Sequence, residues 1–290
     1  MGNKELKEVI LQDYHNKLTP LVKIISERNE SHNKKANKVN KAISEHRKNI
    51  ISRLPSLAGD VNPQQARIIL QYATSVVSFE YRHNVWPYEY MALSRRVGEH
   101  WEKFCSAAWD SPSRKGVQRF KAPTFDSVAG ELRCNIEEHF KDHAAREKVA
   151  KSLDVVFELV GEINMKEDEV FYVDGVPHVI DFKSGFGSNE KGNTLRLLAV
   201  GKAYKLWNPD TVLLFLVRQE KNNNYLNHIR KSGLWEVYCG NEAYEKIDEL
   251  TGSRICDIRK DVVDFSEDLS DKFWDDLSRH LADLSGYFSW

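Results

Sequence analysis

Two acidic residues and a lysine lie close to a hairpin signal in the second half of the chain. Asp174-Gly175 separates two apolar runs, and Asp-Gly in such a setting is the strongest short-range indicator of a β-hairpin. When the strands are paired outward from this two-residue turn, Asp168 falls opposite Asp181. Side chains alternate along a strand, so Lys183 shares a face with Asp181. Two carboxylates beside an ammonium group could bind a divalent cation, because Mg²⁺ prefers hard carboxylate oxygens.

The strand register decides which acid faces Asp181. A bulge or a longer turn would bring Glu167 or Glu169 opposite it instead of Asp168. Directly opposed like charges destabilise a sheet, so either arrangement calls for a bound cation. The other side of the hairpin is apolar, and we expect it to be the core face. It carries Phe171, Val173, Val176, Ile180 and Phe182.

The secondary structure that positions this hairpin is predicted to be helical in the first half of the chain, then mainly strands, then helical again. Apolar residues at three-and-four spacing predict helices over 4–28, 36–54, 62–79, 89–108, 126–152, 193–207, 241–251 and 266–285. Pro55 and Gly59 are expected to end the second of these helices. Strands are predicted over 155–159, 169–173, 176–182, 211–217 and 235–239. Residues 111–121 are expected to form a basic loop.

This order of elements predicts an α/β fold. A mixed central β-sheet would be flanked by helices, with helical additions at the N-terminal and C-terminal ends. Residues 1–85 would form a helical region, and residues 86–290 would form the core with the C-terminal helices. Because no linker separates these regions, we expect them to make one compact unit.

Composition narrows the class of protein. The 290 residues include 42 Lys and Arg against 43 Asp and Glu, and no apolar run approaches the roughly 18 residues of a membrane-spanning helix. Four scattered cysteines without a CxxC pair suit buried free thiols in a reducing cytosol better than disulfides or a zinc site. Eight Lys and Arg between Arg28 and Arg53, against two acids, suit either phosphate contact or a solvated helix face.

Asp168 followed by Asp181-Phe182-Lys183 resembles the D…(D/E)xK signature of the PD-(D/E)xK nuclease superfamily. Glu167 stands where the usual proline would be. The segment Gly98-Glu99-His100-Trp101-Glu102 is similar to a Gly-x-x-aromatic-Glu segment of many restriction endonucleases in this superfamily. Residues 235–244 also look like a segment found near the end of some type II restriction enzymes. The resemblance covers roughly residues 90–250.

The resemblance implies a restriction-endonuclease-like core and a role for each matching residue. Asp168, Asp181 and the backbone carbonyl of Phe182 would hold Mg²⁺, for which Mn²⁺ could substitute. Lys183 would position or activate the attacking water, and Glu102 would join the metal site. Whether Glu167 or Asp168 is the first metal ligand stays open.

The resulting hypothesis is a Mg²⁺-dependent type II restriction endonuclease that hydrolyses double-stranded DNA at a short specific sequence. It would act as a homodimer in the prokaryotic cytoplasm, without a nucleotide cofactor, and the helical region 1–85 would dimerise or clamp DNA. The absence of helicase or methyltransferase motifs favours this class over the alternative of a repair or recombination nuclease of the same superfamily. A further alternative is a non-catalytic nucleic-acid-binding module, because an isolated Asp-x-Lys on a strand is often a surface ion pair.

Polar and basic residues outside the hairpin are candidates for DNA contact. A basic loop suits phosphates, and Arg and Asn side chains can read base edges in the major groove. The alternative for each segment is an ordinary solvated turn. The candidate DNA-binding residues are Arg114, Lys115, Arg119, Ser184, Ser188, Arg218, Asn222, Asn223 and Asn224.

Overall fold

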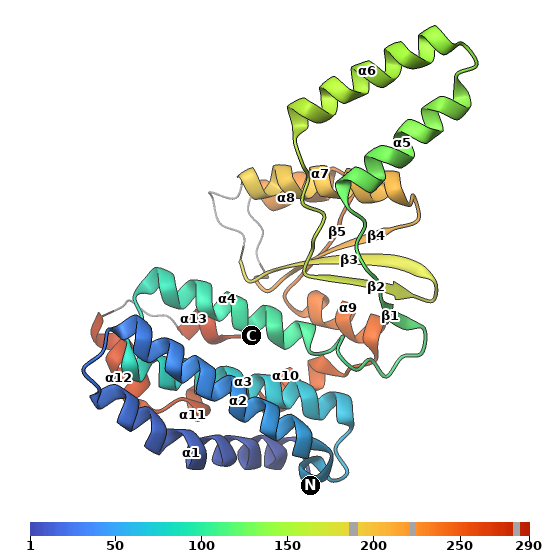
Figure 1. Cartoon of the computed structure of the whole chain (residues 1–290). Coiled ribbons are helices and arrows are strands. Elements are labelled where there is room, and N and C mark those ends of the chain that lie inside the picture. The colour runs from blue at the N-terminus through green and yellow to red at the C-terminus, as the bar shows by residue number, and fades with distance from the viewer. Residues whose placement is uncertain (186–190, 221–223, 281–284) are drawn as a thin grey trace. The chain divides into compact units, whose positions relative to one another are not determined.

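A computed structural model describes residues 1–185, 191–220, 224–280 and 285–290. The chain groups into two units (Figure 1). A helical unit comprises Met1–Arg114 and Tyr244–Trp290, and a sheet unit comprises Lys115–Ala243. The chain passes from one unit to the other after Arg114 and after Ala243, and the division into regions 1–85 and 86–290 stays a prediction.

Helix α3 is the centre of the helical unit. Apolar side chains are buried around most of its circumference, as expected of a helix packed on several sides. It contacts α1, α2, α4 and the later helix α10 (Ile255–Val262). The bounds of these four helices are α1 (Asn3–Glu27), α2 (His32–Ala58), α3 (Pro63–Val85) and α4 (Tyr90–Ser106).

Helix α2 does not end at Pro55 as the sequence suggested. It continues one further turn to Ala58 and ends at Gly59, whose positive φ of 54° suits a glycine. Leu54 and Ala58 are buried on either side of the proline, so their packing offsets the one backbone hydrogen bond that proline cannot donate.

The C-terminal part of the chain is more broken than the single helix predicted over 266–285. Capped turns interrupt it, and Asp264 caps one short helix by accepting from two backbone N–H groups. The elements are α9 (Asn241–Thr251), α10 (Ile255–Val262), α11 (Phe265–Asp268), α12 (Asp271–His280) and α13 (Ser285–Phe288).

The sheet unit contains a mixed sheet of five strands among the described residues, in the order β1-β2-β3-β4-β5. The first three strands are antiparallel, and β3, β4 and β5 run parallel to one another. The bounds are β1 (Val117–Arg119), β2 (Glu169–Val173), β3 (Val176–Lys183), β4 (Val212–Val217) and β5 (Glu236–Cys239). The prediction of a mixed α/β fold is confirmed, and β1 lies inside the segment that was expected to be a loop.

Helices α7 (Lys191–Trp207) and α8 (Asn224–Lys231) cover one face of this sheet (Figure 1). Pairing across β3 and β4 puts Asp181 on this covered face, beside Phe215. The core beneath the helices includes Val179, Leu197, Val200, Tyr204, Leu213, Phe215 and Val217. The expected core face, with Phe171, Ile180 and Phe182, is buried as well. The sequence predicted only one buried face for the hairpin. Both faces of β3 are buried, and Asp181 lies on the one that was not expected to be.

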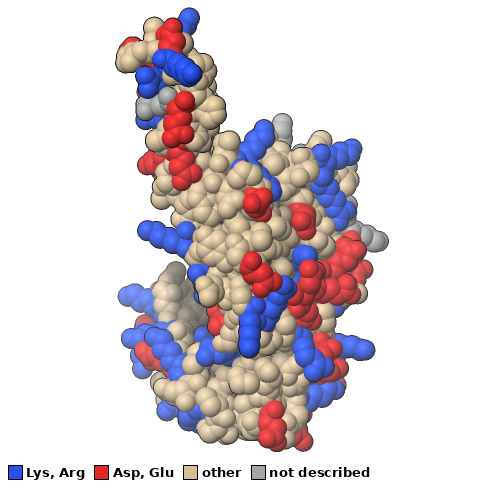
Figure 2. All heavy atoms as spheres, turned by 90° about the vertical axis from the view of Figure 1, so that its right-hand side faces the viewer, with Lys and Arg blue, Asp and Glu red and all other residues tan. Residues whose placement is uncertain are grey.

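Helices α5 (Phe125–His139) and α6 (His143–Val160) form an arm that projects from the sheet (Figure 1). Lys, Arg, Asp and Glu are interspersed along the face of the arm shown in Figure 2. The strand predicted over 155–159 is wrong, because α6 runs on from its Asp142 cap to Gly161. Val155 and Val156 are half exposed there, so this apolar run belongs to a partly exposed helix instead of a core strand.

Two predictions from composition can be compared with the structure. Within the described residues, the model contains no helix with the length and hydropathy needed to cross a membrane. All four cysteines are free thiols, but only Cys105 and Cys239 are buried, and Cys134 is exposed.

Candidate functional site

The hairpin has the predicted register. Asp174 and Gly175 both have positive φ, 51° and 85°, which defines the tight two-residue turn that suits strand twist. Residue pairs then follow outward in the predicted order, from Val173 with Val176 to Glu169 with Ile180. The ladder contains no bulge, so the alternative that placed Glu169 opposite Asp181 is excluded.

Asp168 lies one residue before β2 and reaches β3 through its side chain. Its Oδ2 accepts a hydrogen bond of 2.8 Å from the backbone N–H of Phe182. Partial desolvation and the charge of Asp181 raise the pKa of Asp168, although the Phe182 N–H and Lys183 act in the opposite direction. The structure therefore brings Asp168 and Asp181 together, as the hairpin pattern predicted.

Arg196 on α7 completes this cluster and was missed by the sequence analysis. Its guanidinium donates to Oε1 of Glu167 across 2.7 Å and to Oδ2 of Asp181 across 2.6 Å. The side chains of Glu167 and Asp181 are only 1% and 4% exposed. A helical wheel could have found it, because Arg196 lies one turn before Val200 on the sheet-facing side of α7.

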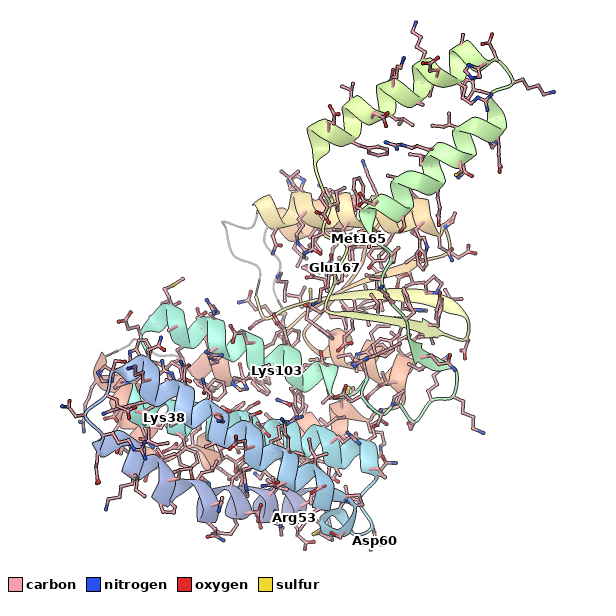
Figure 3. All side chains as sticks on the ribbon, viewed as in Figure 1. Lys38, Arg53, Asp60, Lys103, Met165 and Glu167 are labelled. Carbon is pink, nitrogen blue, oxygen red and sulfur yellow. The ribbon has the colours of Figure 1, made fainter. Side chains whose placement is uncertain are left out.

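Glu167 is placed between the sheet and α7, on the segment that leads into β2 (Figure 3). Burial and the adjacent carboxylate of Asp181 raise the pKa of Glu167 to about 9, although Arg196 opposes the shift. Glu167 is therefore protonated at neutral pH in this arrangement and can donate a hydrogen bond to Asp181.

One oxygen of Asp181 lacks a partner within the part of the protein that the structure describes. Oδ1 is buried and has no hydrogen-bond partner among the described residues, whereas a buried carboxylate oxygen normally has one. No group of three or more His, Cys, Asp or Glu is placed to hold a metal in the described part of the chain. Mg²⁺ is often bound by only one or two carboxylates and completes its shell with water and phosphate. Asp168 and Asp181 fit that smaller donor set.

A second group of predicted residues gathers where β3 and β4 end. Lys183 is the last residue of β3 and is half-buried. Its carbonyl accepts from the N–H of Arg218 across 2.8 Å, and Nε of Arg218 donates to Ser184 Oγ across 2.9 Å. Ser184 and Arg218, two of the predicted DNA contacts, therefore lie next to the lysine of the candidate site.

A cavity of about 570 Å³ lies beside the acidic residues at the start of β2. Glu167, Asp168 and Glu169 line it together with the basic residues Arg119 and Lys166. It gives the cluster an opening in which a ligand of mixed polarity could bind.

The other predicted DNA contacts are distributed over several places. Nη2 of Arg119 donates to both carboxylate oxygens of Glu169, at 3.1 and 3.3 Å. Lys115 is exposed at the start of the sheet unit, whereas Arg114 belongs to the helical unit and donates to the Glu249 carbonyl. Asn224 is the first residue of α8. Ser188, Asn222 and Asn223 lie outside the described residues.

Glu102, the fourth predicted catalytic residue, belongs to the helical unit. It is half-buried on α4, two residues beyond the fully packed His100. Its place in a metal site with Asp168 and Asp181 stays a prediction, as does the role of the Phe182 carbonyl.

Comparison with protein-family models, with curated proteins and with solved structures found no match. The function is therefore argued from the geometry and chemistry of the chain itself.

Proposed function

We propose that this protein is a Mg²⁺-dependent endonuclease that hydrolyses double-stranded DNA, with the site organisation of a PD-(D/E)xK nuclease and most like a type II restriction enzyme. The hairpin ladder is the observation that carries the proposal. It places Asp168 against the strand that presents Asp181 and Lys183 on one face, which is the arrangement the motif requires.

Asp168 and Asp181, with the carbonyl of Phe182, would hold the metal ion. A bound Mg²⁺ would supply Lewis-acid polarisation of the scissile phosphate and a lowered pKa for water. Lys183, at the end of β3, would hold the attacking water and offset charge that develops on the phosphate. Arg218, whose Nε donates to Ser184 Oγ, would add positive charge near a bound DNA phosphate.

Arg196 acts on the site through Asp181. By binding Oδ2 it fixes the carboxylate and leaves Oδ1 for the metal ion. It also offsets negative charge in the absence of metal, when the acids would otherwise repel one another. Arg196 is therefore a positioning residue in this proposal, and Asp168, Asp181 and Lys183 are the catalytic ones.

The same arginine supports a second candidate, a non-catalytic nucleic-acid-binding module. A guanidinium that bridges two buried carboxylates can be a structural ion cluster with no catalytic purpose. Under this alternative the basic residues would contact DNA, but no phosphodiester bond would break.

A plasmid-cleavage assay separates the two candidates. The nuclease proposal expects cleavage with Mg²⁺ or Mn²⁺, no cleavage in EDTA, and discrete DNA bands if the enzyme is sequence-specific. Asp181→Asn should abolish cleavage, whereas the matched control Asp210→Asn, at an exposed turn before β4, should cut normally. Cleavage that persists in EDTA would overturn the metal site, and an inactive wild-type protein that still binds DNA would favour the second candidate.

A further inference from the structure

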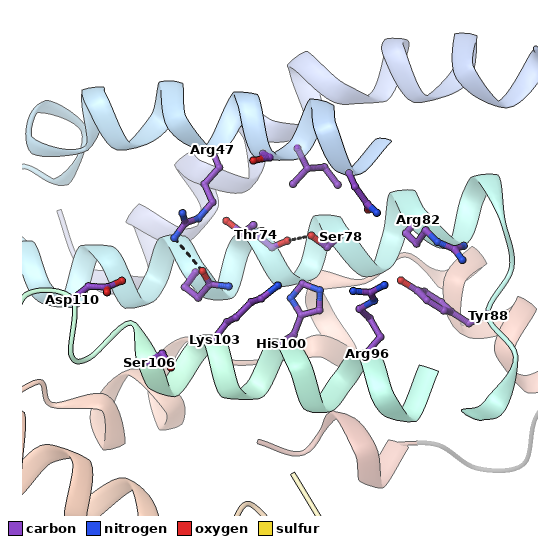
Figure 4. A pocket seen from close by; sticks show the side chains of 14 residues that line it. Arg47, Thr74, Ser78, Arg82, Tyr88, Arg96, His100, Lys103, Ser106 and Asp110 are labelled. Carbon is purple, nitrogen blue, oxygen red and sulfur yellow. Dashed lines mark hydrogen bonds between the residues drawn. The ribbon is translucent and has the colours of Figure 1, made fainter. Parts of the chain in front are cut away.

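A polar cavity of about 490 Å³ lies within the helical unit, between α2, α3 and α4 (Figure 4). Its volume is in the range of small-molecule sites, which lie near 300–1,000 Å³. All of its lining residues belong to the helical unit, and the proposed nuclease mechanism uses none of them. Most such sites are lined by apolar side chains, so a polar lining indicates a polar ligand.

Four cationic side chains from three helices line this cavity. Arg47 extends from α2, Arg82 from α3, and Arg96 and Lys103 from α4 (Figure 4). Arg96 forms an ion pair of 2.6 Å with Glu99. Among the described residues, no carboxylate forms a salt bridge with Arg47, Arg82 or Lys103. Like charges gathered in this way repel one another, and an anion bound between them would relieve that repulsion.

Two buried polar atoms in the lining have no hydrogen-bond partner among the described residues. They are the hydroxyl of Tyr88, a residue that is only 6% exposed, and Nε of Arg47. The Tyr88 hydroxyl points toward the guanidinium of Arg96 in Figure 4. A buried unpaired polar group costs stability, and such groups in native proteins often face a ligand or ion.

The remaining lining supplies hydrogen-bonding groups without further positive charge, and it includes one carboxylate, that of Asp110. His100 contacts Ser75 Oγ across 3.0 Å, and burial lowers its pKa to about 3, so its imidazole is neutral at ordinary pH. Arg47 donates to the Gln71 side chain across 3.1 Å, which orients its guanidinium from α2 toward α3. The hydroxyls of Ser44, Thr74, Ser78 and Ser106 also line the space.

We propose that this cavity binds a small phosphate-bearing anion, with Arg47, Arg82, Arg96 and Lys103 as its cationic ligands and the Tyr88 hydroxyl as a donor. Phosphate groups match the lining because they carry several acceptor oxygens and more than one negative charge. Arginine binds them through two parallel N–H groups, and lysine binds them as a point charge. The volume admits a compound with one or two phosphate groups and excludes a macromolecule from its interior.

Calorimetric titration of the full-length protein with pyrophosphate at low ionic strength tests this inference. We expect saturable binding that Arg47→Gln and Lys103→Gln each weaken by about tenfold or more, because each removes charge-assisted hydrogen bonds. Lys103 is exposed, so its replacement should leave the fold intact. Lys48→Gln is the matched control, since Lys48 lies on α2 outside the cavity and carries the same charge.

A second titration with ADP identifies the source of the phosphate. Tighter binding of ADP than of pyrophosphate would assign a nucleotide, and equal or weaker binding would assign inorganic phosphate groups. Absence of saturable pyrophosphate binding would overturn the proposal. Equal weakening by Lys48→Gln would do the same, because the effect would then be general surface electrostatics. If the cavity variants weaken only DNA binding and no small phosphate binds, the cavity belongs to a DNA-contact surface and the proposal fails.

Discussion

The guanidinium of Arg196 donates to Oδ2 of Asp181 across 2.6 Å and thereby ties α7 to the end of β3. The same guanidinium donates to Glu167 across 2.7 Å, so one cation serves two buried carboxyl groups. Burial and the adjacent carboxylate of Asp181 raise the pKa of Glu167, so that residue keeps its proton at neutral pH. Arg196 binds only Oδ2 of Asp181, and Oδ1 has no hydrogen-bond partner among the described residues.

The first prediction separates DNA binding from cleavage. Asp181→Asn should lower the cleavage rate by several orders of magnitude, because it removes a metal ligand. Its DNA affinity in EDTA should hold or rise, since about 1 kcal/mol of repulsion between carboxylate and phosphate is relieved. Lys183→Ala should also abolish cleavage but should weaken DNA binding. Plasmid cleavage and fluorescence anisotropy in EDTA measure the two quantities.

These two variants are informative as a pair. They should agree in activity and differ in metal-free affinity, which loss of folding would not produce. If Asp181→Asn cuts plasmid at nearly the wild-type rate, the hairpin cluster is structural and the active site lies elsewhere.

The second prediction concerns the stability that Arg196 provides. Removing one partner of a fully buried ion pair costs about 3–5 kcal/mol, because the other charge is left uncompensated. Arg196 is 36% exposed, so solvent reduces this cost, and Arg196→Gln should lower the free energy of unfolding by about 2 kcal/mol. Urea denaturation of wild type and variant measures this change in the free energy of unfolding. Lys202→Gln, an exposed change on the same helix, is the control and should have almost no effect. Equal stability of both variants would show that the bridge adds nothing.

The third prediction is a pH dependence of stability caused by Glu167. Its pKa lies near 9 in the folded protein and near its ordinary 4.5 in the unfolded chain. Between these values the native state holds a proton that the unfolded state has released, so stability falls as pH rises. Glu167→Gln mimics the protonated carboxyl and should flatten this fall. Denaturation curves at several pH values between 5 and 9 check it, and parallel pH profiles of variant and wild type would contradict it.

The fourth prediction decides between the two candidates for the first metal ligand. Asp168 contacts the Phe182 N–H directly, whereas protonated Glu167 is occupied with Arg196 and Asp181. We therefore expect Asp168→Asn to abolish cleavage and Glu167→Gln to retain most of it. Mg²⁺ titrations of the cleavage rate compare the variants. The opposite order of activities would assign Glu167 as the ligand.

The sequence predicted the fold correctly where neighbouring residues alone determine the backbone conformation. The Asp174-Gly175 turn sets the hairpin register by itself, so the sequence alone placed Asp168 near Asp181. The run over 155–159 was misassigned, because a short apolar stretch fits a strand and a helix equally well. Its helical state follows from the cap at Asp142, some three turns earlier in α6.

The candidate site was only partly predictable because its charges meet through tertiary packing. Arg196 is distant in sequence from the hairpin and reaches it only when α7 packs on the sheet. The same packing buries Glu167 and produces its raised pKa, which no local motif encodes. The cationic cavity likewise combines residues from three helices. The excess of Lys and Arg between Arg28 and Arg53 therefore indicated positive charge but did not identify this site.

The last prediction concerns Tyr88 in that cavity. Its hydroxyl is buried without a partner among the described residues, which costs stability in the protein without ligand. Tyr88→Phe keeps the ring and its contact with the Arg82 guanidinium, so it should raise the free energy of unfolding by about 1 kcal/mol. It should at the same time weaken pyrophosphate binding several-fold, because a donor to the phosphate is lost. Thermal denaturation and calorimetry give the two numbers on the same samples. A purely structural tyrosine would not produce opposite signs, so a variant that is less stable and binds pyrophosphate normally would remove Tyr88 from the proposed site.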